Sequence, residues 1–311
     1  MKKKITFAVV GIAAALLVYF TVFSSGKTEI NVLVFSKTEG FRHESIEPGI
    51  EAVKKLGEQH NFQIEATEDA NVFNEEKLKD FQVIIFLNTT QDILNPEQQV
   101  QMERFIQAGG GFVGVHAAAD TEYAWPWYGK LVGAYFDGHP SNPNVRKATL
   151  RVLNANHAAT DSLPKDWVYT DEWYNYKAIN EENNVLINLD ESTYEGGTNG
   201  ENHPIAWYKE YDGGRMFYTG LGHTKESFSD PLFLKHLMGG IKYAIGAGTL
   251  VDYSRAYSEV MPEENRFTKV LLTQNLNEPM ELDFLSDDKI IFVERKGGIH
   301  MFDLSVGQDQ L

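Results

Sequence analysis

The chain has 311 residues, of which 42% are hydrophobic and 23% are charged, a globular composition with room for one sizeable α/β domain and a remainder. A formal net charge of −16 argues against a nucleic-acid partner, because phosphate binding needs clustered lysine and arginine side chains. The absence of cysteine excludes disulfides, thiolate zinc sites and a cysteine nucleophile.

The N-terminus has the pattern of an export segment. "MKKK" precedes an uncharged apolar run over residues 5–23, and small residues follow it. This order predicts a signal peptide over residues 1–26. The apolar run is also about long enough to span a bilayer, so an uncleaved membrane anchor is the alternative. In either case we expect an exported domain, periplasmic or extracellular, free or anchored in the membrane.

Predicted strands and helices alternate in the first part of the chain. Strands are predicted over 29–35, 62–67, 81–90 and 111–115. Helices are predicted over 44–59 and 95–109, the second with Asn95 as N-cap and Pro96 at its first position. Three alanines after His116 open a further expected helix. This alternation predicts a parallel sheet covered by helices on both faces.

The rest of the chain is less regular. Residues 120–180 are aromatic and without a clear period, a hairpin turn is expected at 212–214, and a closing helix is expected over 230–248. The first domain is therefore predicted to span 29–248, followed by a linker over 249–266. Residues 267–311 alternate like short strands but are too few to bury a core, which predicts a truncated all-β segment.

Histidines stand at the ends of predicted strands. In α/β sheets, ligands bind beyond the carboxyl ends of the strands, so the loops after Phe35, Leu87 and Val115 are candidates for a site. Two of these loops contain His43 and His116. His116 occupies the strand-to-helix elbow at which many α/β enzymes place a serine or cysteine nucleophile.

Four stretches, "GGGFVGVHAAADT", "WPWYGKLVGAYFDGHP", "DEWYNY" and "HPIAWYKEYDGGRMFYTGLGHTKESFSDP", carry a family resemblance. With them, residues 31–247 resemble the ThuA-like (trehalose utilisation) family, which implies a flavodoxin-like, class I glutamine-amidotransferase-like fold and a role in carbohydrate catabolism. The stretch "NEPMELDFLSDDKIIFVERKGGIHMFDLS" resembles the start of a sugar/sorbosone dehydrogenase-type β-propeller. Such propellers imply a quinone or calcium dependence, for which this segment is too short.

The resemblance also shows that the elbow cysteine of the amidotransferases is absent from this chain. Amidotransferases of this fold have a cysteine at the elbow and a histidine after a later strand, and these positions match His116 and His223 here. Because imidazole does not replace a thiolate in amide hydrolysis, we do not expect glutaminase activity.

Clustered histidines suit either acid–base catalysis or a divalent metal, which makes such a metal a candidate cofactor. The catalytic candidates are His116, His223, Glu172 and Asp120. The substrate-binding candidates are His43, His139, Trp127, Trp173, Tyr174 and His203. The metal-ligand candidates are His43, His116, His139 and His223, and the carboxylates that could complete the site, as ligands or by orienting a ring, are Asp120, Asp171 and Glu172.

These residues leave two functions open. The first is an exported enzyme that processes a sugar or an oxidised (keto) sugar at a histidine-centred site. The alternative is a non-catalytic carbohydrate-binding module attached to a sugar dehydrogenase propeller, in which the aromatic side chains would matter more than the histidines. A purely structural interaction domain fits less well, because so many polar residues converge on strand ends. In the first two cases the partner is a small carbohydrate.

Overall fold

The computed structural model describes residues 29–260, 271–273, 276–305 and 308–310. They fall into a first unit that ends at Val260 and a second unit after it. The predicted signal or anchor segment, residues 1–26, lies outside the described residues, as do residues 261–266 of the predicted linker. Within the described ranges, none of the helices combines the length and apolar character needed to cross a bilayer.

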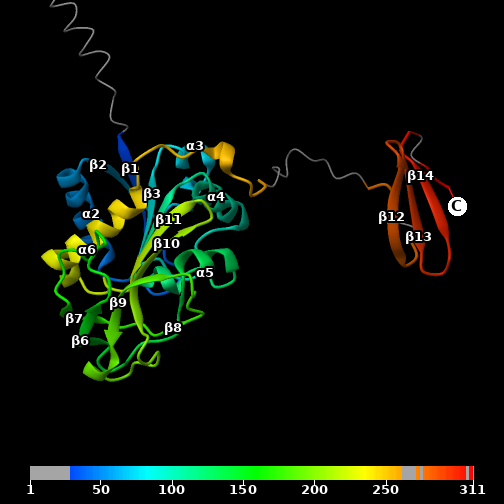
Figure 1. The fold of residues 1–311 in the computed structure, drawn as a ribbon. Coiled ribbons are helices and arrows are strands. Elements are labelled where there is room, and N and C mark those ends of the chain that lie inside the picture. The colour runs from blue at the N-terminus through cyan, green and yellow to red at the C-terminus, as the bar shows by residue number, and fades with distance from the viewer. Residues whose placement is uncertain (1–28, 261–270, 274–275, 306–307, 311) are drawn as a thin grey trace, which may run out of the picture. The chain divides into compact units, whose positions relative to one another are not determined.

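A nine-stranded sheet in the order β2-β1-β3-β4-β11-β10-β9-β6-β7 forms the centre of the first unit (Figure 1). Its strands are β1 (Ile30–Phe35), β2 (Phe62–Thr67), β3 (Val83–Leu87), β4 (Gly111–Val115), β6 (Val145–Val152), β7 (Asp166–Glu172), β9 (Asn184–Asp190), β10 (Pro204–Tyr211) and β11 (Gly214–Thr219). Strands β2, β1, β3, β4 and β11 run parallel, which confirms the predicted parallel sheet. A separate pair joins β5 (Tyr135–Phe136) to β8 (Tyr176–Lys177).

The other four strands of the large sheet pair antiparallel. The predicted irregular region, 120–180, in fact contains β6 and β7. These strands bury only one face: Ala148 and Leu150 of β6 are buried, whereas Lys147 and Arg151 are exposed. Charged residues at alternate positions gave this stretch a polar character, and the strand period was therefore missed.

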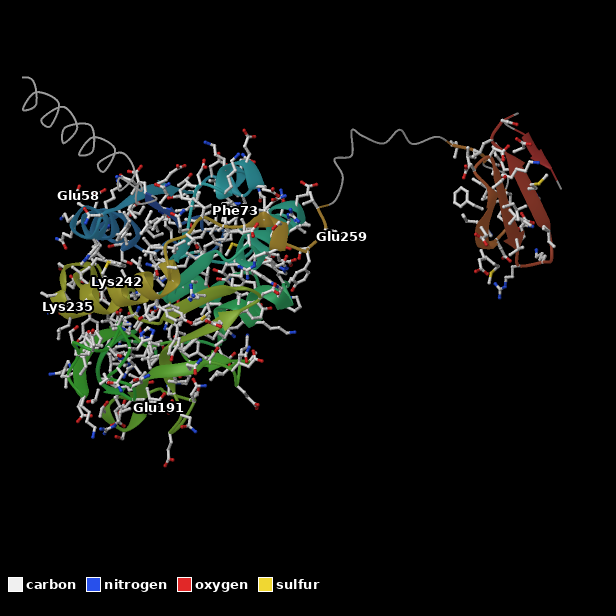
Figure 2. The ribbon with its side chains drawn as sticks, turned by 45° about the horizontal axis from the view of Figure 1, so that its top comes forward. Glu58, Phe73, Glu191, Lys235, Lys242 and Glu259 are labelled. Carbon is white, nitrogen blue, oxygen red and sulfur yellow. The ribbon has the colours of Figure 1, made fainter. Side chains whose placement is uncertain are left out.

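Helices cover both faces of the sheet, as predicted. They are α2 (Ile46–His60), α3 (Glu75–Leu78), α4 (Pro96–Gln107), α5 (Pro126–Val132) and α6 (Pro231–Ile245). Helices α2 and α6 lie on one side and α3, α4 and α5 on the other (Figure 1). Charged side chains such as Glu58, Lys235 and Lys242 lie on the outside of the helices (Figure 2). Helix α4 begins with the predicted Asn95 cap, which forms a reciprocal capping box with Gln98.

The helix expected after His116 is only the short 3₁₀ helix η2 (His116–Asp120). His116 has a φ of +47°, outside the right-handed helical region, so an α-helix cannot begin there. The Tyr218 hydroxyl donates to the His116 carbonyl at 2.7 Å, and the Tyr128 hydroxyl donates to the Ala118 carbonyl at 2.6 Å. These carbonyls are taken by side chains from other elements, and the chain leaves the helical path at Thr121, which is extended.

The first unit continues beyond the predicted boundary at residue 248. The Asp252 amide donates to the Ala108 carbonyl at 2.8 Å, and the Ser258 hydroxyl donates to Glu103 on α4 at 2.6 Å. Residues 252–258 of the predicted linker therefore pack against the end of α4.

The second unit is a four-stranded antiparallel sheet, in agreement with the all-β prediction. Its strands are β12 (Pro279–Ser286), β13 (Lys289–Glu294), β14 (Ile299–Asp303) and β15 (Gln308–Gln310). Alternate residues of β12, namely Met280, Leu282 and Phe284, are 66%, 62% and 62% exposed. One face of the sheet thus presents apolar side chains that the described residues do not cover, as expected for a segment too short to bury a core.

Candidate metal centre

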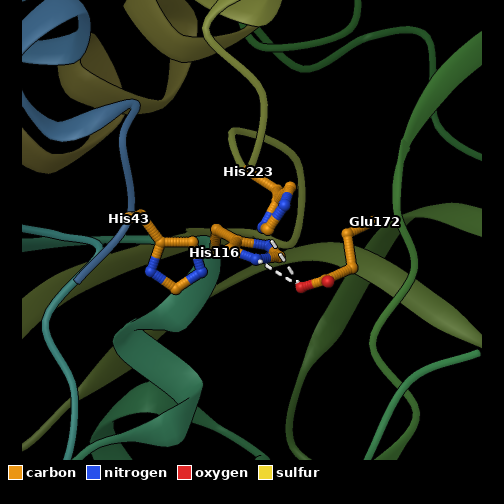
Figure 3. A group of neighbouring side chains, drawn as sticks. All are labelled: His43, His116, Glu172 and His223. Carbon is orange, nitrogen blue, oxygen red and sulfur yellow. Dashed lines mark ion pairs between the residues drawn. The ribbon is translucent and has the colours of Figure 1, made fainter. Parts of the chain in front are cut away.

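Four side chains meet beyond the carboxyl ends of the parallel strands: His43, His116, Glu172 and His223. One ligand atom from each lies within 4.8 Å of all the others. His43 is in the loop after β1, His116 follows β4, and His223 is in the loop after β11. Glu172 is the last residue of β7, at the far edge of the sheet. In Figure 3 the three imidazoles and the carboxylate converge on one another. All four residues are among the candidates predicted from the sequence.

His116 keeps an elbow geometry. Its φ is +47°, in the left-handed region that residues other than glycine seldom adopt. Its side chain is fully buried, and its Nδ1 donates to the Gly220 carbonyl at 2.8 Å. A carbonyl accepts only, so Nδ1 carries the proton and the Nε2 lone pair is directed at the cluster. This is the arrangement of a histidine that binds a metal through Nε2.

Glu172 lies between two of the histidines. Its Oε2 is 3.3 Å from Nε2 of His116 and 3.2 Å from Nδ1 of His223, and its Oε1 accepts from Asn144 Nδ2 at 2.5 Å. Burial alone would raise the pKa of Glu172, but the two neighbouring imidazoles of His116 and His223 outweigh it and lower the pKa overall. The carboxylate is therefore ionised at neutral pH.

The surroundings of His43 and His223 shift the pKa values of the two side chains in opposite directions. Burial, with the nearby His116 and His223, lowers the pKa of His43 to about 2, so its ring is neutral and free to bind a metal. Burial also acts to lower the pKa of His223, but the neighbouring Glu172 carboxylate raises it overall. The His223 side chain is 17% exposed, which leaves one side of the cluster open to solvent.

The cluster fits a divalent transition metal. Nε2 of His116, Nδ1 of His223 and Nδ1 of His43 are buried and make no hydrogen bond. Metal–ligand bonds of about 2.1 Å at tetrahedral angles place ligand atoms about 3.4 Å apart, close to the 3.2 and 3.3 Å separations from Glu172. Three imidazoles and one carboxylate suit zinc, manganese, iron or nickel better than magnesium or calcium.

Asp171 supports the loop that carries His223. It is fully buried, and it accepts hydrogen bonds from the Gly222 amide at 2.8 Å, the Ser227 hydroxyl at 3.1 Å and the Glu172 amide at 2.9 Å. Asp171 therefore holds the backbone of this loop, whereas the prediction for it was a metal ligand or a carboxylate that orients an imidazole ring. Burial raises its pKa, but its partners are all hydrogen-bond donors that suit the ionised form.

Gly222 is held from the other side by two residues that the sequence analysis did not name. Its carbonyl accepts from Ser45 Oγ at 3.0 Å and from Asn88 Nδ2 at 3.2 Å, and its φ of +112° explains why a glycine precedes His223. Asn88 is the first residue after β3, in one of the three loops predicted to form the site. Its position in that loop could have identified Asn88 from the sequence.

Two further candidates lie outside the four-residue cluster. His139 is at its rim: Nε2 is 3.6 Å from Oε1 of Glu172, its side chain is 33% exposed, and Nδ1 is 2.8 Å from the Pro140 carbonyl. Asp120 accepts instead from the Tyr123 hydroxyl at 2.6 Å and from Gln91 at 3.1 Å. Burial raises the pKa of Asp120.

The predicted aromatic residues do not form an open surface at the cluster. Trp127 donates to Asp212 at 2.8 Å, at the hairpin turn that precedes β11, whereas His223 follows the other end of that strand. Trp173 is fully buried and donates to the Arg146 carbonyl at 2.8 Å. Only Tyr174 is adjacent, with its ring 4.1 Å from that of His116, and it is 3% exposed.

His203 also lies outside the cluster. It is fully buried between Glu191 and the Tyr174 carbonyl, each 2.7 Å from one of its ring nitrogens. It therefore supports the backbone of Tyr174 and does not face the open side of the site.

Known proteins share this fold and sequence pattern. The family profile described as trehalose utilisation, ThuA, matches residues 31–244. The chain is similar to a ThuA-like protein of known structure from Bacteroides uniformis ATCC 8492, with 27% identity, a TM-score of 0.60 and coverage of 70% of this chain and 92% of that one. A ThuA-like protein from Parabacteroides merdae ATCC 43184 shares the fold at 18% identity and a TM-score of 0.55, over 71% of this chain and 91% of that one. No curated protein matches.

Proposed function

The chain belongs to the ThuA (trehalose utilisation) family, and on that premise we propose that its first unit is an enzyme that processes a sugar or an oxidised (keto) sugar at a bound divalent metal. The proposed ligands are His43, His116, Glu172 and His223. One observation carries the proposal: four ligand atoms converge within 4.8 Å, and three of the buried ring nitrogens there have no hydrogen bond.

A divalent cation at this position would supply a Lewis acid that polarises a carbonyl or hydroxyl oxygen of a sugar. Neighbouring residues hold the proposed metal ligands in place. Asn144 orients the Glu172 carboxylate, and the Gly220 carbonyl sets the tautomer of His116. His139, partly exposed at the rim, offers Nε2 as a hydrogen-bond partner for a substrate that reaches the cluster.

The alternative, a carbohydrate-binding module without turnover, depends on the aromatic side chains that were predicted from the sequence to bind substrate. Trp127 is distant from the cluster and Trp173 is buried, which favours the enzyme. Export through residues 1–26 and continuation into a sugar dehydrogenase-type propeller after the first unit are parts of the same proposal, supported by the sequence patterns alone.

Metal content and turnover together test the proposal. Wild type, His116→Ala and a control, His60→Ala on the exposed end of α2, would be purified without chelator and analysed by inductively coupled plasma mass spectrometry. Trehalose and a keto-trehalose would then be offered to each and the products followed by mass spectrometry. We expect about one ion per chain in wild type and control, and loss of both metal and turnover in His116→Ala.

A well-folded wild type without metal would overturn the proposed centre. Metal and sugar binding without turnover would favour the module.

A further inference from the structure

Phe41 is an exposed aromatic side chain beside the four-residue cluster. Its ring centroid lies 4.9 Å from that of His43, edge to face at 85°. His43 is 3% exposed, whereas Phe41 is 65% exposed. Single exposed apolar residues are common on protein surfaces, so exposure alone means little. What distinguishes Phe41 is its contact with a proposed metal ligand at the carboxyl edge of the sheet.

The backbone around Phe41 is held in place. The Gly40 amide donates to Thr90 Oγ1 at 3.1 Å, and the same hydroxyl donates to the Phe41 carbonyl at 3.2 Å. A Cβ at Gly40 would lie 2.7 Å from Cγ of Gln91, so only glycine permits this close approach to the β3 loop. On the other side, Arg42 is anchored by ion pairs to two glutamates, Glu47 and Glu68. The backbone that carries the exposed phenyl ring is thus held in place.

We propose that Phe41 is the platform on which the ring of a pyranose substrate stacks next to the metal. The inference rests on the proposed function and names the substrate class and its binding surface. A pyranose has a face made largely of C–H groups, and these pack against an aromatic face as other apolar groups do. A sugar stacked on Phe41 has its hydroxyl or carbonyl substituents next to His43 and the proposed metal.

Phe41 also replaces the tryptophan platform that the sequence suggested. Trp127 and Trp173 have their indole nitrogens engaged within the protein and Trp173 is fully buried, whereas Phe41 leaves most of its ring exposed. Because stacking requires a ring, the platform selects cyclic sugars over open-chain sugar alcohols of similar polarity.

The test is a binding measurement on the full chain with its metal, using trehalose as the probe and sorbitol as the open-chain comparison. Titration calorimetry and saturation-transfer NMR would be applied to wild type, Phe41→Ala, Phe41→Trp and a control, Leu153→Ala. Leu153 is 57% exposed and follows the end of β6 that lies away from Glu172. We expect Phe41→Ala to bind trehalose about tenfold more weakly, with the saturation signal on the ring C–H protons lost. Phe41→Trp should retain binding, Leu153→Ala should match wild type, and sorbitol should bind to none of them.

The outcomes separate this inference from the proposed function. Equal trehalose affinity in wild type and Phe41→Ala would overturn the platform and leave the enzyme proposal standing. Metal lost from Phe41→Ala would also overturn it, because Phe41 would then act by supporting His43. A metal-loaded wild type that binds neither trehalose nor a keto-trehalose would overturn both.

Discussion

Nε2 of His116 lies 3.3 Å from Oε2 of Glu172, although the two residues stand on strands at distant places in the sheet. Strands β11, β10, β9 and β6 lie between β4 and β7. In a flat sheet, this separation would be about 24 Å. The contact therefore requires the antiparallel half of the sheet to twist and bend until its edge strand reaches the carboxyl ends of the parallel half.

Substitutions of Glu172 and of Asp120 should differ in their effect on metal affinity. Glu172→Gln removes the charged ligand, and we expect the metal affinity to fall at least tenfold, as measured by competition with a chromogenic chelator. Asp120→Asn should keep the wild-type affinity, because Asp120 is hydrogen-bonded to Tyr123 and Gln91 outside the cluster. If Asp120→Asn lost the metal as well, the proposed ligand set would be incomplete.

Asp171 should matter for stability as well as for the site. Asp171→Asn places an amide donor among N–H and O–H donors, and we expect a loss of about 2–4 kcal/mol in the free energy of unfolding by urea. Ser227→Ala, which removes only one of these partners, should cost about 1 kcal/mol. Equal stability of Asp171→Asn and wild type would mean that Asp171 is protonated in the folded protein.

His236 should make the first unit sensitive to acid. It is fully buried, with its ring nitrogens 2.8 Å from the Ala159 carbonyl and 3.1 Å from Thr219 Oγ1. Burial lowers its pKa to about 4 in the folded state, below the usual 6.5. The unfolded chain therefore binds a proton at a pH where the folded chain does not. The stability from this group is complete above pH 6.5 and decreases as the pH falls toward 4, by up to about 3 kcal/mol.

The variant His236→Gln tests this dependence. Its free energy of unfolding, measured by urea denaturation at several pH values, should fall less steeply between pH 6.5 and 4 than that of wild type. Parallel curves for the two proteins would contradict the assignment.

Trp127 should contribute to stability and not to carbohydrate binding. Its ring packs 5.1 Å from that of Trp125, and its indole nitrogen donates to Asp212 at 2.8 Å. We expect Trp127→Ala to lower the free energy of unfolding by about 1–3 kcal/mol and to leave metal content and trehalose affinity unchanged. A large loss of trehalose affinity in the folded variant would support a sugar-binding surface at the hairpin end of the sheet.

Much of the parallel half could be predicted from the sequence. Strands β3 and β4 and residues 32–35 of β1 are buried on both faces, so each is an uninterrupted apolar run, and the caps of α4 and α6 are local signals. The edge of the sheet at which these side chains converge also followed from the sequence, because parallel strands align their carboxyl ends. His43, His116 and His223 were found on that basis or through the family resemblance.

The tertiary structure decided the rest. The sequence placed Glu172 among candidates on its aromatic surroundings, but its contact with His116 depends on the bend of a nine-stranded sheet, which no local pattern encodes. The same holds for Asp171 and Asn88, whose partners lie 51 and 134 residues away at Gly222. Trp127, predicted to bind substrate, is partly buried against Trp125, whereas Phe41, which was not a candidate, is exposed, because exposure depends on which distant segments cover a ring. Residue type and period determine which elements form, whereas long-range packing determines which side chains meet.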